Sequence, residues 1–191
     1  MIRSALLGAI ATVLMQFSLR LPIFPGFLSL DVSDLPALIG AITTGPITGL
    51  LTLLIKNLLD PLIFGTNTGG IGNFANFIMG VSLVLPIGIV FKKRSDNIGY
   101  ALGSFFGIVS LIIVSSLTNY FILIPLYSRI FIPIDRIIEM ANAINSNVTG
   151  VPTLIIFAII PFNLLKGFIV VVFGFAIYRS LNPVLSRLRR R

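Results

Sequence analysis

Residues 151–177, VPTLIIFAIIPFNLLKGFIVVVFGFAI, form an apolar stretch that decides the class of this protein. A helix needs about 20 apolar residues to cross the roughly 30 Å hydrocarbon core of a bilayer, so this stretch predicts a membrane helix. Inside it, the segment PFNLLKG at 161–167 carries Asn163 and Lys166, which a lipid-facing helix should not contain. The sequence therefore predicts a membrane helix with a polar face turned toward other helices.

The composition of the whole chain agrees with this prediction. Of the 191 residues, 56% are hydrophobic and only 10% are charged, and the mean hydropathy is +1.05. Several other apolar stretches have membrane-spanning length, whereas a β-barrel would show short alternating segments. We therefore expect an all-α integral membrane protein formed by a single domain, residues 1–191.

The apolar runs predict six transmembrane helices and two longer outer loops. The segment TTGP at 43–46 predicts a break between the second and third spans, since glycine followed by proline is typical of a helix boundary. One long kinked helix is the alternative. The predicted spans are residues 2–20, 34–44, 46–63, 71–91, 98–124 and 153–179.

The two outer loops differ in character. The first, residues 21–33, is rich in proline and large apolar residues, and we expect this lid loop to pack back over the bundle. The second covers residues 125–152. It has apolar residues at helical spacing, which favours a short amphipathic helix, with a plain surface loop as the alternative; these residues are Ile134, Ile137, Ile138, Ala141 and Ile144.

The basic residues predict the orientation in the cell membrane. Lysine and arginine collect in cytoplasmic loops, and six spans place both termini on one side. The basic residues on that side are Arg3, the cluster 92–94, Arg179, Arg187, Arg189, Arg190 and Arg191, whereas five of the six acids lie in or beside the opposite loops. We expect cytoplasmic N- and C-termini, with the net charge of +8 contacting anionic lipid and no nucleic acid.

The residue types needed for most catalysis are missing. The sequence has no histidine and no cysteine, and no carboxylate falls clearly inside a predicted span. General acid–base and metal-assisted chemistry therefore lack their usual groups. We expect neither an enzyme nor a metal site.

Polar residues inside the predicted spans are the candidate functional residues. Intramembrane polar groups are expensive and usually face the interior or mark a binding site. Asn76, Asn119, Asn163 and Lys166 lie in the outer halves of their spans, and the last two share a helix face. For each asparagine, a helix-to-helix hydrogen bond is the alternative role. Lys56 in the third span is the other predicted buried cation; the alternatives are that it extends outward or pairs with Asp60 one turn later.

Small residues at four-residue spacing predict close helix approach in two spans. Ala5 and Ala9 lie in the first span, and glycines recur at 99, 103 and 107 in the fifth. Internal packing is the first interpretation. On the first helix, a docking face for a separate membrane subunit is the second.

Over nearly its whole length the chain resembles the riboflavin-specific S components of energy-coupling factor (ECF) vitamin transporters. The stretches that carry the resemblance are LPIFPGFLSLDVSDLPALIGAITTGPITG (21–49), IKNLL (55–59), GNFANFIMGVS (72–82), LTNYFILIPLY (117–127) and IIPFNLLKG (159–167). The resemblance implies a six-helix S-component bundle that binds riboflavin as a substrate, with no cofactor. It also implies a transmembrane T subunit and two cytoplasmic ATPases as partners.

The same resemblance implies roles for individual residues. Asn119, Asn163 and Lys166 match family residues that bind riboflavin near the outer surface, under the loop between the first two helices. Five further positions lie in matching stretches and are assigned to the site by position: Leu28, Leu30, Thr43, Asn76 and Gly80. The small residues Ala5, Gly8 and Ala9 match the family's docking face for the T subunit. The alternatives are an S component for another vitamin or FMN, an ATP-independent carrier, and a packing protein without a ligand.

Overall fold

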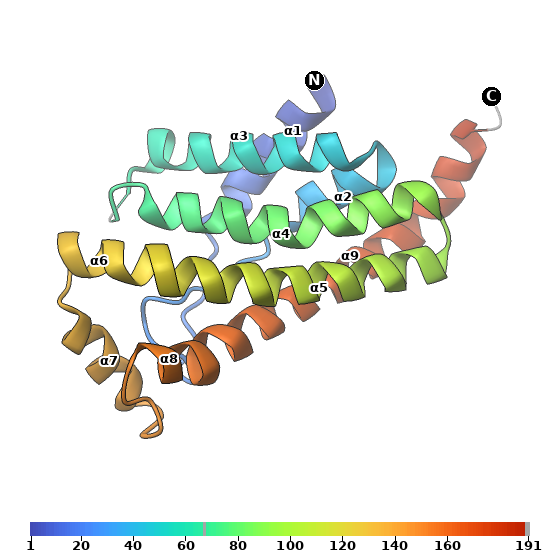
Figure 1. The fold of residues 1–191 in the computed structure, drawn as a ribbon. Helices are drawn as coiled ribbons and strands as arrows, with labels where there is room; N and C mark the ends of the chain where they lie inside the picture. The colour runs from blue at the N-terminus through green and yellow to red at the C-terminus, as the bar shows by residue number, and fades with distance from the viewer. Residues whose placement is uncertain (67, 190–191) are drawn as a thin grey trace.

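The computed structural model describes residues 1–66 and 68–189, and the side chains of residues 1–66 and 68–180; Arg190 and Arg191 of the basic tail lie outside the described residues. The described chain is a helical bundle (Figure 1). Its helices are α1 (Ile2–Met15), α2 (Leu35–Thr43), α3 (Pro46–Phe64), α4 (Ile71–Lys93), α5 (Asn97–Thr118), α6 (Ile124–Ile130), α7 (Ile134–Asn142), α8 (Val151–Leu154) and α9 (Ile160–Arg189). Two π-helical segments, η1 (Asn119–Leu123) and η2 (Ile155–Ile159), join α5 to α6 and α8 to α9.

In the described part of the chain, four helices are long and apolar enough to cross a membrane: Pro46–Phe64, Ile71–Lys93, Asn97–Ile130 and Val151–Ser180. The first helix, α1, is apolar but shorter. The all-helical membrane fold predicted from the sequence is confirmed. Helix α2 has nine residues and is only about 13 Å long at 1.5 Å per residue. The second predicted span, residues 34–44, is thus a short helix that cannot cross the hydrocarbon core by itself.

The first predicted span also ends early. Helix α1 stops at Met15, not near residue 20, because the chain turns there to form the start of the connection to α2. Leu19 and Leu30 exchange backbone N–H···O hydrogen bonds of 2.8 Å in each direction. This local pairing satisfies backbone groups that a longer helix would have satisfied internally.

The break between α2 and α3 lies where the sequence predicts it. Gly45 separates the two helices with φ +129°, a conformation that residues with a Cβ rarely adopt. Pro46 is the first residue of α3, where its missing N–H removes no helical hydrogen bond. The structure thus has two helices in place of the one kinked helix.

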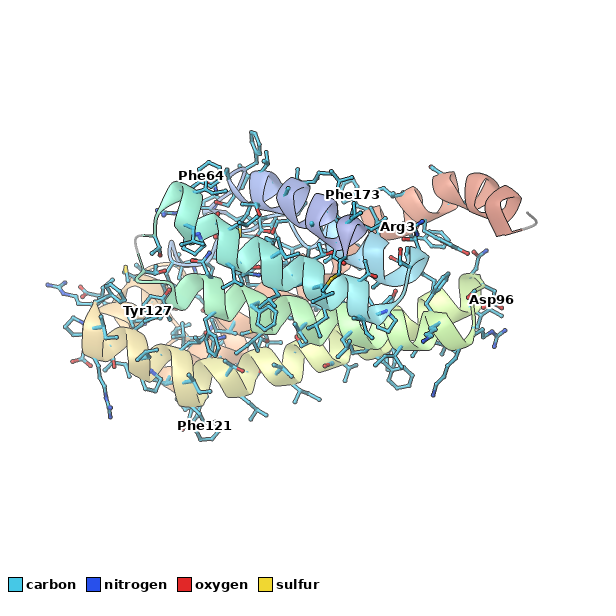
Figure 2. The ribbon with its side chains drawn as sticks, turned by 90° about the horizontal axis from the view of Figure 1, so that it is seen from above. Arg3, Phe64, Asp96, Phe121, Tyr127 and Phe173 are labelled. Atoms are coloured by element: carbon cyan, nitrogen blue, oxygen red, sulfur yellow. The ribbon has the colours of Figure 1, made fainter. Side chains whose placement is uncertain are left out.

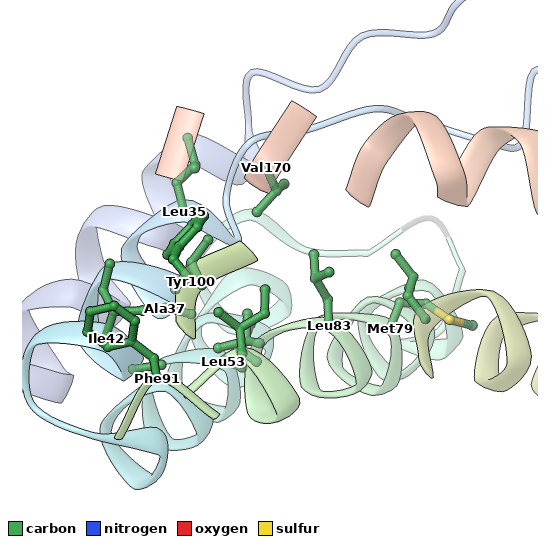
Figure 3. Packing of buried hydrophobic residues seen from close by; sticks show 14 of the residues in the cluster. Leu35, Ala37, Ile42, Leu53, Met79, Leu83, Phe91, Tyr100 and Val170 are labelled. Carbon is green, nitrogen blue, oxygen red and sulfur yellow. The ribbon is translucent and has the colours of Figure 1, made fainter. Parts of the chain in front are cut away.

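The core lies between α2, α3, α4, α5 and α9, and Figure 3 shows apolar side chains of these helices packed together. The glycine stripe of α5 faces α4, because a Cβ at Gly107 would lie 2.6 Å from the carbonyl oxygen of Leu83. Gly103 approaches the backbone of Ile87 in the same way. On this helix, the internal-packing interpretation of the small residues is the one that the structure supports.

The bundle has two distinct ends. Figure 2 shows Arg3 and Asp96 toward one end and Phe64 and Tyr127 toward the other. The N-terminus and the end of α9 lie away from α6 and α7 (Figure 1). The second outer loop contains the short helix that the spacing predicts, α7, with Ile137 and Ala141 buried. Ile144 lies beyond the end of this helix.

Candidate functional site

The lid loop packs against the end of the bundle that carries α7 and α8. Phe24 is buried and meets Phe162 of α9 edge to face, with ring centroids 5.3 Å apart. Leu28 is half-buried against a cluster that includes Ile137 and Ile155, and Leu30 is held by its pairing with Leu19. The loop thus covers the helix that carries Asn163 and Lys166.

A buried network of charges lies at the end of this loop. Lys56 of α3 has 0% exposure, and its Nζ donates three hydrogen bonds that use all three of its protons. The acceptors are Asp34 Oδ1 at 2.6 Å, Ser33 Oγ at 2.8 Å and Asn76 Oδ1 at 2.8 Å. Lys56 is thus a buried cation as the sequence predicts, and it neither extends outward nor pairs with Asp60.

Lys166 of α9 faces Asp34 and a second aspartate, Asp31. Its Nζ lies 3.0 Å from Asp31 Oδ2 and 3.5 Å from Asp34 Oδ2. Asn76 Nδ2 also donates to Asp31 Oδ2, at 3.3 Å. The structure therefore brings together Lys166 and Asn76, two of the predicted site residues, through an aspartate that the sequence reasoning did not select.

The electrostatics of Asp31 follow from these contacts. Burial alone would raise the pKa of this loop carboxyl, but the charges of Lys166 and Lys56 and a hydrogen bond from Ser33 outweigh burial and lower the pKa below its ordinary value. Asp31 is thus a carboxylate. Two lysines and two aspartates then leave the network electrically neutral.

Asn119 is the first residue of η1, and Asn163 lies one turn after the end of η2. Each donates its side-chain N–H to the carbonyl oxygen four residues earlier: Asn163 to Ile159 at 2.9 Å and Asn119 to Ser115 at 2.8 Å. Neither Oδ1 accepts a hydrogen bond from any residue that the structure describes. Both hydrogen bonds lie within one helical segment, so the structure does not show the alternative role of these two asparagines, a hydrogen bond between helices. Each amide oxygen remains able to accept a hydrogen bond from a ligand. Segments η1 and η2 contact each other, and π-helical turns often occur at functional sites.

The remaining positions predicted for the site separate into two groups. Gly80 of α4 lies against the network, since a Cβ there would be 3.0 Å from Asp34 Oδ1 and 2.8 Å from Leu53. Thr43 is at the C-terminal end of α2, and its hydroxyl donates to Ile39 of its own helix. Asp34 precedes the other end of α2, so the structure does not bring Thr43 into the network.

The sequence reasoning missed Asp31, Ser33, Asp34 and the role of Lys56. It placed the acids in outer loops, where they counted only as evidence for orientation. The available signal was the pair of lysines in predicted spans, because a buried cation requires an opposite charge. Asp60, the expected partner of Lys56, instead accepts hydrogen bonds from Gln16 and from Asn73, the latter at 2.6 Å.

An open groove with a volume of about 590 Å³ lies beside the lid loop. Its walls are the lid loop around Pro22 and Pro25, the loop that follows α7, and Phe157 and Ala158 of η2. None of the predicted ligand-binding residues lines it. The groove is also lined by none of the charged residues of the network.

The predicted docking face on α1 is divided between the surface and the interior. Ala5 and Ala9 are exposed, whereas Gly8 is buried against α3, where a Cβ would lie 2.5 Å from Ile55 Cγ2. Gly8 thus serves close packing between α1 and α3. Only the two alanines lie where another membrane protein could contact them.

Comparison with known proteins gives a consistent result. Residues 1–178 match the family model described as "ECF transporter, substrate-specific component". The riboflavin transporter RibU of Staphylococcus aureus (strain TCH60) is 34% identical over 188 residues, which cover 98% of this chain and 93% of the relative. The riboflavin transporter FmnP of Bacillus subtilis (strain 168) is 32% identical over 186 residues, with 97% and 93% coverage.

A solved structure, the S component of a bacterial ECF transporter, has the same fold. It superposes with a TM-score of 0.75 at 33% identity and covers 96% of this chain and 95% of its own. The sequence resemblance is thereby confirmed. The chain belongs to the substrate-specific (S) components of ECF transporters, multi-pass membrane proteins that are not enzymes and that work with an energising module.

Proposed function

We propose that this S component captures riboflavin at the outer face of the cell membrane and delivers it to a T subunit and two cytoplasmic ATPases. The observation that carries the proposal is the set of polar side chains within the spans, the buried Asn163 and Lys166 and the half-buried Asn119, with the lid loop packed over α9. Relatives at 32–34% identity named riboflavin transporters support this choice of ligand.

The chemistry of these side chains suits a neutral, flat ligand with many hydrogen-bonding groups. Lys166 directs donors at Asp31 and Asp34, and of its three N–H groups one remains for a ligand carbonyl. The two asparagine oxygens can accept from the ring N–H or the ribityl hydroxyls. Apolar groups such as Phe24 and Phe162 supply surface for the isoalloxazine ring.

Riboflavin entry requires the lid loop to move in this proposal. Phe24 closes over Phe162, so the loop must withdraw Phe24 before a ring can reach Asn163. The hydrogen bonds from Lys56 to Ser33 and Asp34 anchor the far end of the loop. We therefore expect the movement to be confined to the part of the loop near Phe24.

The orientation with both termini in the cytoplasm belongs to the same proposal. Arg3 and the loop that contains Asp96 lie at one end of the bundle (Figure 2), and the basic cluster 92–94 precedes that loop. Positive charge gathered at one end favours a cytoplasmic location. The lid loop and α7 then face outside.

The first test is the ligand of the protein purified in detergent from cells grown in rich medium. We expect the absorption spectrum of a flavin, and extraction should release riboflavin at about one molecule per chain. Protein stripped of ligand should quench the fluorescence of added riboflavin. Tight binding of thiamine or biotin with none of riboflavin would contradict the proposal, and uptake into liposomes by this chain alone at physiological rates would favour the carrier alternative.

The second test concerns docking of the energising module on α1. Ala9→Trp should abolish co-purification of the module while riboflavin binding stays unchanged, because an indole on an exposed small-residue face prevents close helix approach. Ile10→Trp is the matched control, since Ile10 is also exposed but lies 100° further around the helix. Equal loss of the module in both variants would argue against a docking face at Ala9.

A further inference from the structure

An exposed apolar turn lies at the end of the bundle that carries α7. Ile130 is the last residue of α6, and Phe131 and Ile132 follow it before Pro133 and the start of α7. The exposed fractions of Ile130, Phe131 and Ile132 are 57%, 41% and 39%. Neighbouring large apolar side chains that are exposed together often mark an interaction surface.

The conformation of this turn is fixed by the chain itself. The backbone N–H groups of Phe131 and Ile132 both donate to the carbonyl oxygen of Tyr127, at 2.9 and 3.2 Å. The rings of Phe131 and Tyr127 also pack together, with centroids 5.8 Å apart. The exposure of the apolar side chains is therefore a property of the fold.

We propose that residues 129–133, the apolar turn, insert into the membrane–water interface at the α7 end of the bundle, so that lipid is their partner. The apolar side chains would contact the upper part of the acyl chains. The exposed Arg129 would extend to the lipid phosphates. This inference concerns a lipid-binding site and does not depend on riboflavin capture.

The first step of the argument is the length of the helix that ends at the turn. Residues Asn97–Ile130 form one apolar stretch of 34 residues, which runs along the bundle as α5, η1 and α6 (Figure 1). At about 1.5 Å per residue it is about 51 Å long, whereas a bilayer with its headgroups is about 40–45 Å thick. An upright helix would therefore expose the apolar turn to water. A tilt of about 30–40°, within the range of membrane helices, shortens the span to about 39–44 Å and places the turn at the interface.

The second step is that the same helix has a lipid-facing surface. Exposed apolar residues recur every three or four positions along α5 and η1, which places them on one helix face; they are Leu102, Phe106, Val109, Ile113, Leu117 and Phe121. Figure 2 shows Phe121 pointing away from the bundle. In a multi-pass membrane protein such a face contacts lipid, and the apolar turn lies at the end of this helix.

The third step is the change of character after the turn. The exposed side chains of α7 are mostly polar, and Arg136 pairs with Glu139 at 2.8 Å while their side chains remain 70% and 65% exposed. An ion pair that open belongs in water or among headgroups. Apolar exposure thus gives way to charged exposure within a few residues, as expected where the chain passes from lipid to water.

The test uses the absence of tryptophan from the sequence, because a single introduced indole then reports one position. The full chain carrying Phe131→Trp is reconstituted without ligand into phosphatidylcholine nanodiscs. Apolar groups at the interface lie about 5–10 Å into the boundary between headgroups and acyl chains. Lipid brominated near the headgroup end of its chains should therefore remove about half or more of the indole fluorescence, and acrylamide in the water should quench it weakly.

Two matched variants calibrate the measurement. Asn147→Trp places the indole in the exposed loop after α7, where acrylamide should quench it strongly and brominated lipid should not. Phe121→Trp places it on the lipid-facing surface of η1, where bromine deeper in the chains should quench it best. Ile132→Trp replaces Phe131→Trp if the latter gives no single peak in gel filtration.

The outcomes are clear for the apolar turn. Strong acrylamide quenching of Phe131→Trp or Ile132→Trp, equal to that of Asn147→Trp and without quenching by brominated lipid, would place the turn in water and overturn the proposal. Quenching that matches Phe121→Trp at every bromine depth would place it in the hydrocarbon core and overturn the interfacial position. No flavin takes part in these measurements, so either result leaves the proposed function untouched.

Discussion

Replacing Lys166 by methionine is expected to weaken riboflavin binding by about 100-fold or more. Removing one member of a buried, hydrogen-bonded charge pair typically costs about 2–5 kcal/mol of binding free energy, and 1.4 kcal/mol corresponds to a factor of ten. The variant loses the donor that faces the ligand. It also leaves Asp31, now without its 3.0 Å partner, as a carboxylate that would repel the ring carbonyls.

Fluorescence titration of detergent-purified protein measures this loss. The matched control is Lys92→Met, which removes a lysine from the exposed end of α4 and should bind riboflavin as wild type does. Gel filtration must show the same monodisperse peak for all three proteins, so that weaker binding is not the result of unfolding. Wild-type affinity in a folded Lys166→Met protein would remove Lys166 from the binding site and would contradict the proposed role of this lysine in riboflavin binding.

The helices could be predicted from the sequence because membrane helices depend on local properties. Apolar length, the glycine–proline break before α3 and the spacing of Ile137 and Ala141 each act within a short segment. The early end of α1 could not be predicted in this way. It depends on the pairing of Leu19 with Leu30. Taken alone, the segment around Leu19 or the segment around Leu30 has the composition of an apolar run that continues.

The candidate site shows the same division between local and distant information. Asn163 and Lys166 stand out because they interrupt an apolar helix. The contact of Lys166 with Asp31 spans 135 positions of sequence, and it exists only because the lid loop folds back between α3 and α9. Nothing local to Asp31 or Asp34 distinguishes a buried ion pair from an ordinary outer loop, although two lysines within spans did indicate that opposite charges were needed.

The lysine of α3 gives the second large expected effect, on stability. Lys56→Met should lower the free energy of unfolding by about 3–5 kcal/mol, the usual consequence of removing one partner of a buried ion pair. Three acceptors lose their donor at once, and Asp34 keeps only Lys166, at 3.5 Å. Because Lys56 packs behind the lid loop, the damage should appear first as loosening of the loop.

Thermal unfolding of the ligand-free protein in detergent measures the effect, with Lys92→Met again expected to match wild type. The double variant Lys56→Met/Asp34→Asn should recover a large part of the lost stability, since removing both charges avoids leaving either one buried alone. This recovery distinguishes an ion pair from simple loss of packing, which the second substitution could not repair. If Lys56→Met unfolds at the wild-type temperature, the ammonium group of Lys56 does not stabilise the charge network. The claim that α3 anchors the lid loop would then be wrong.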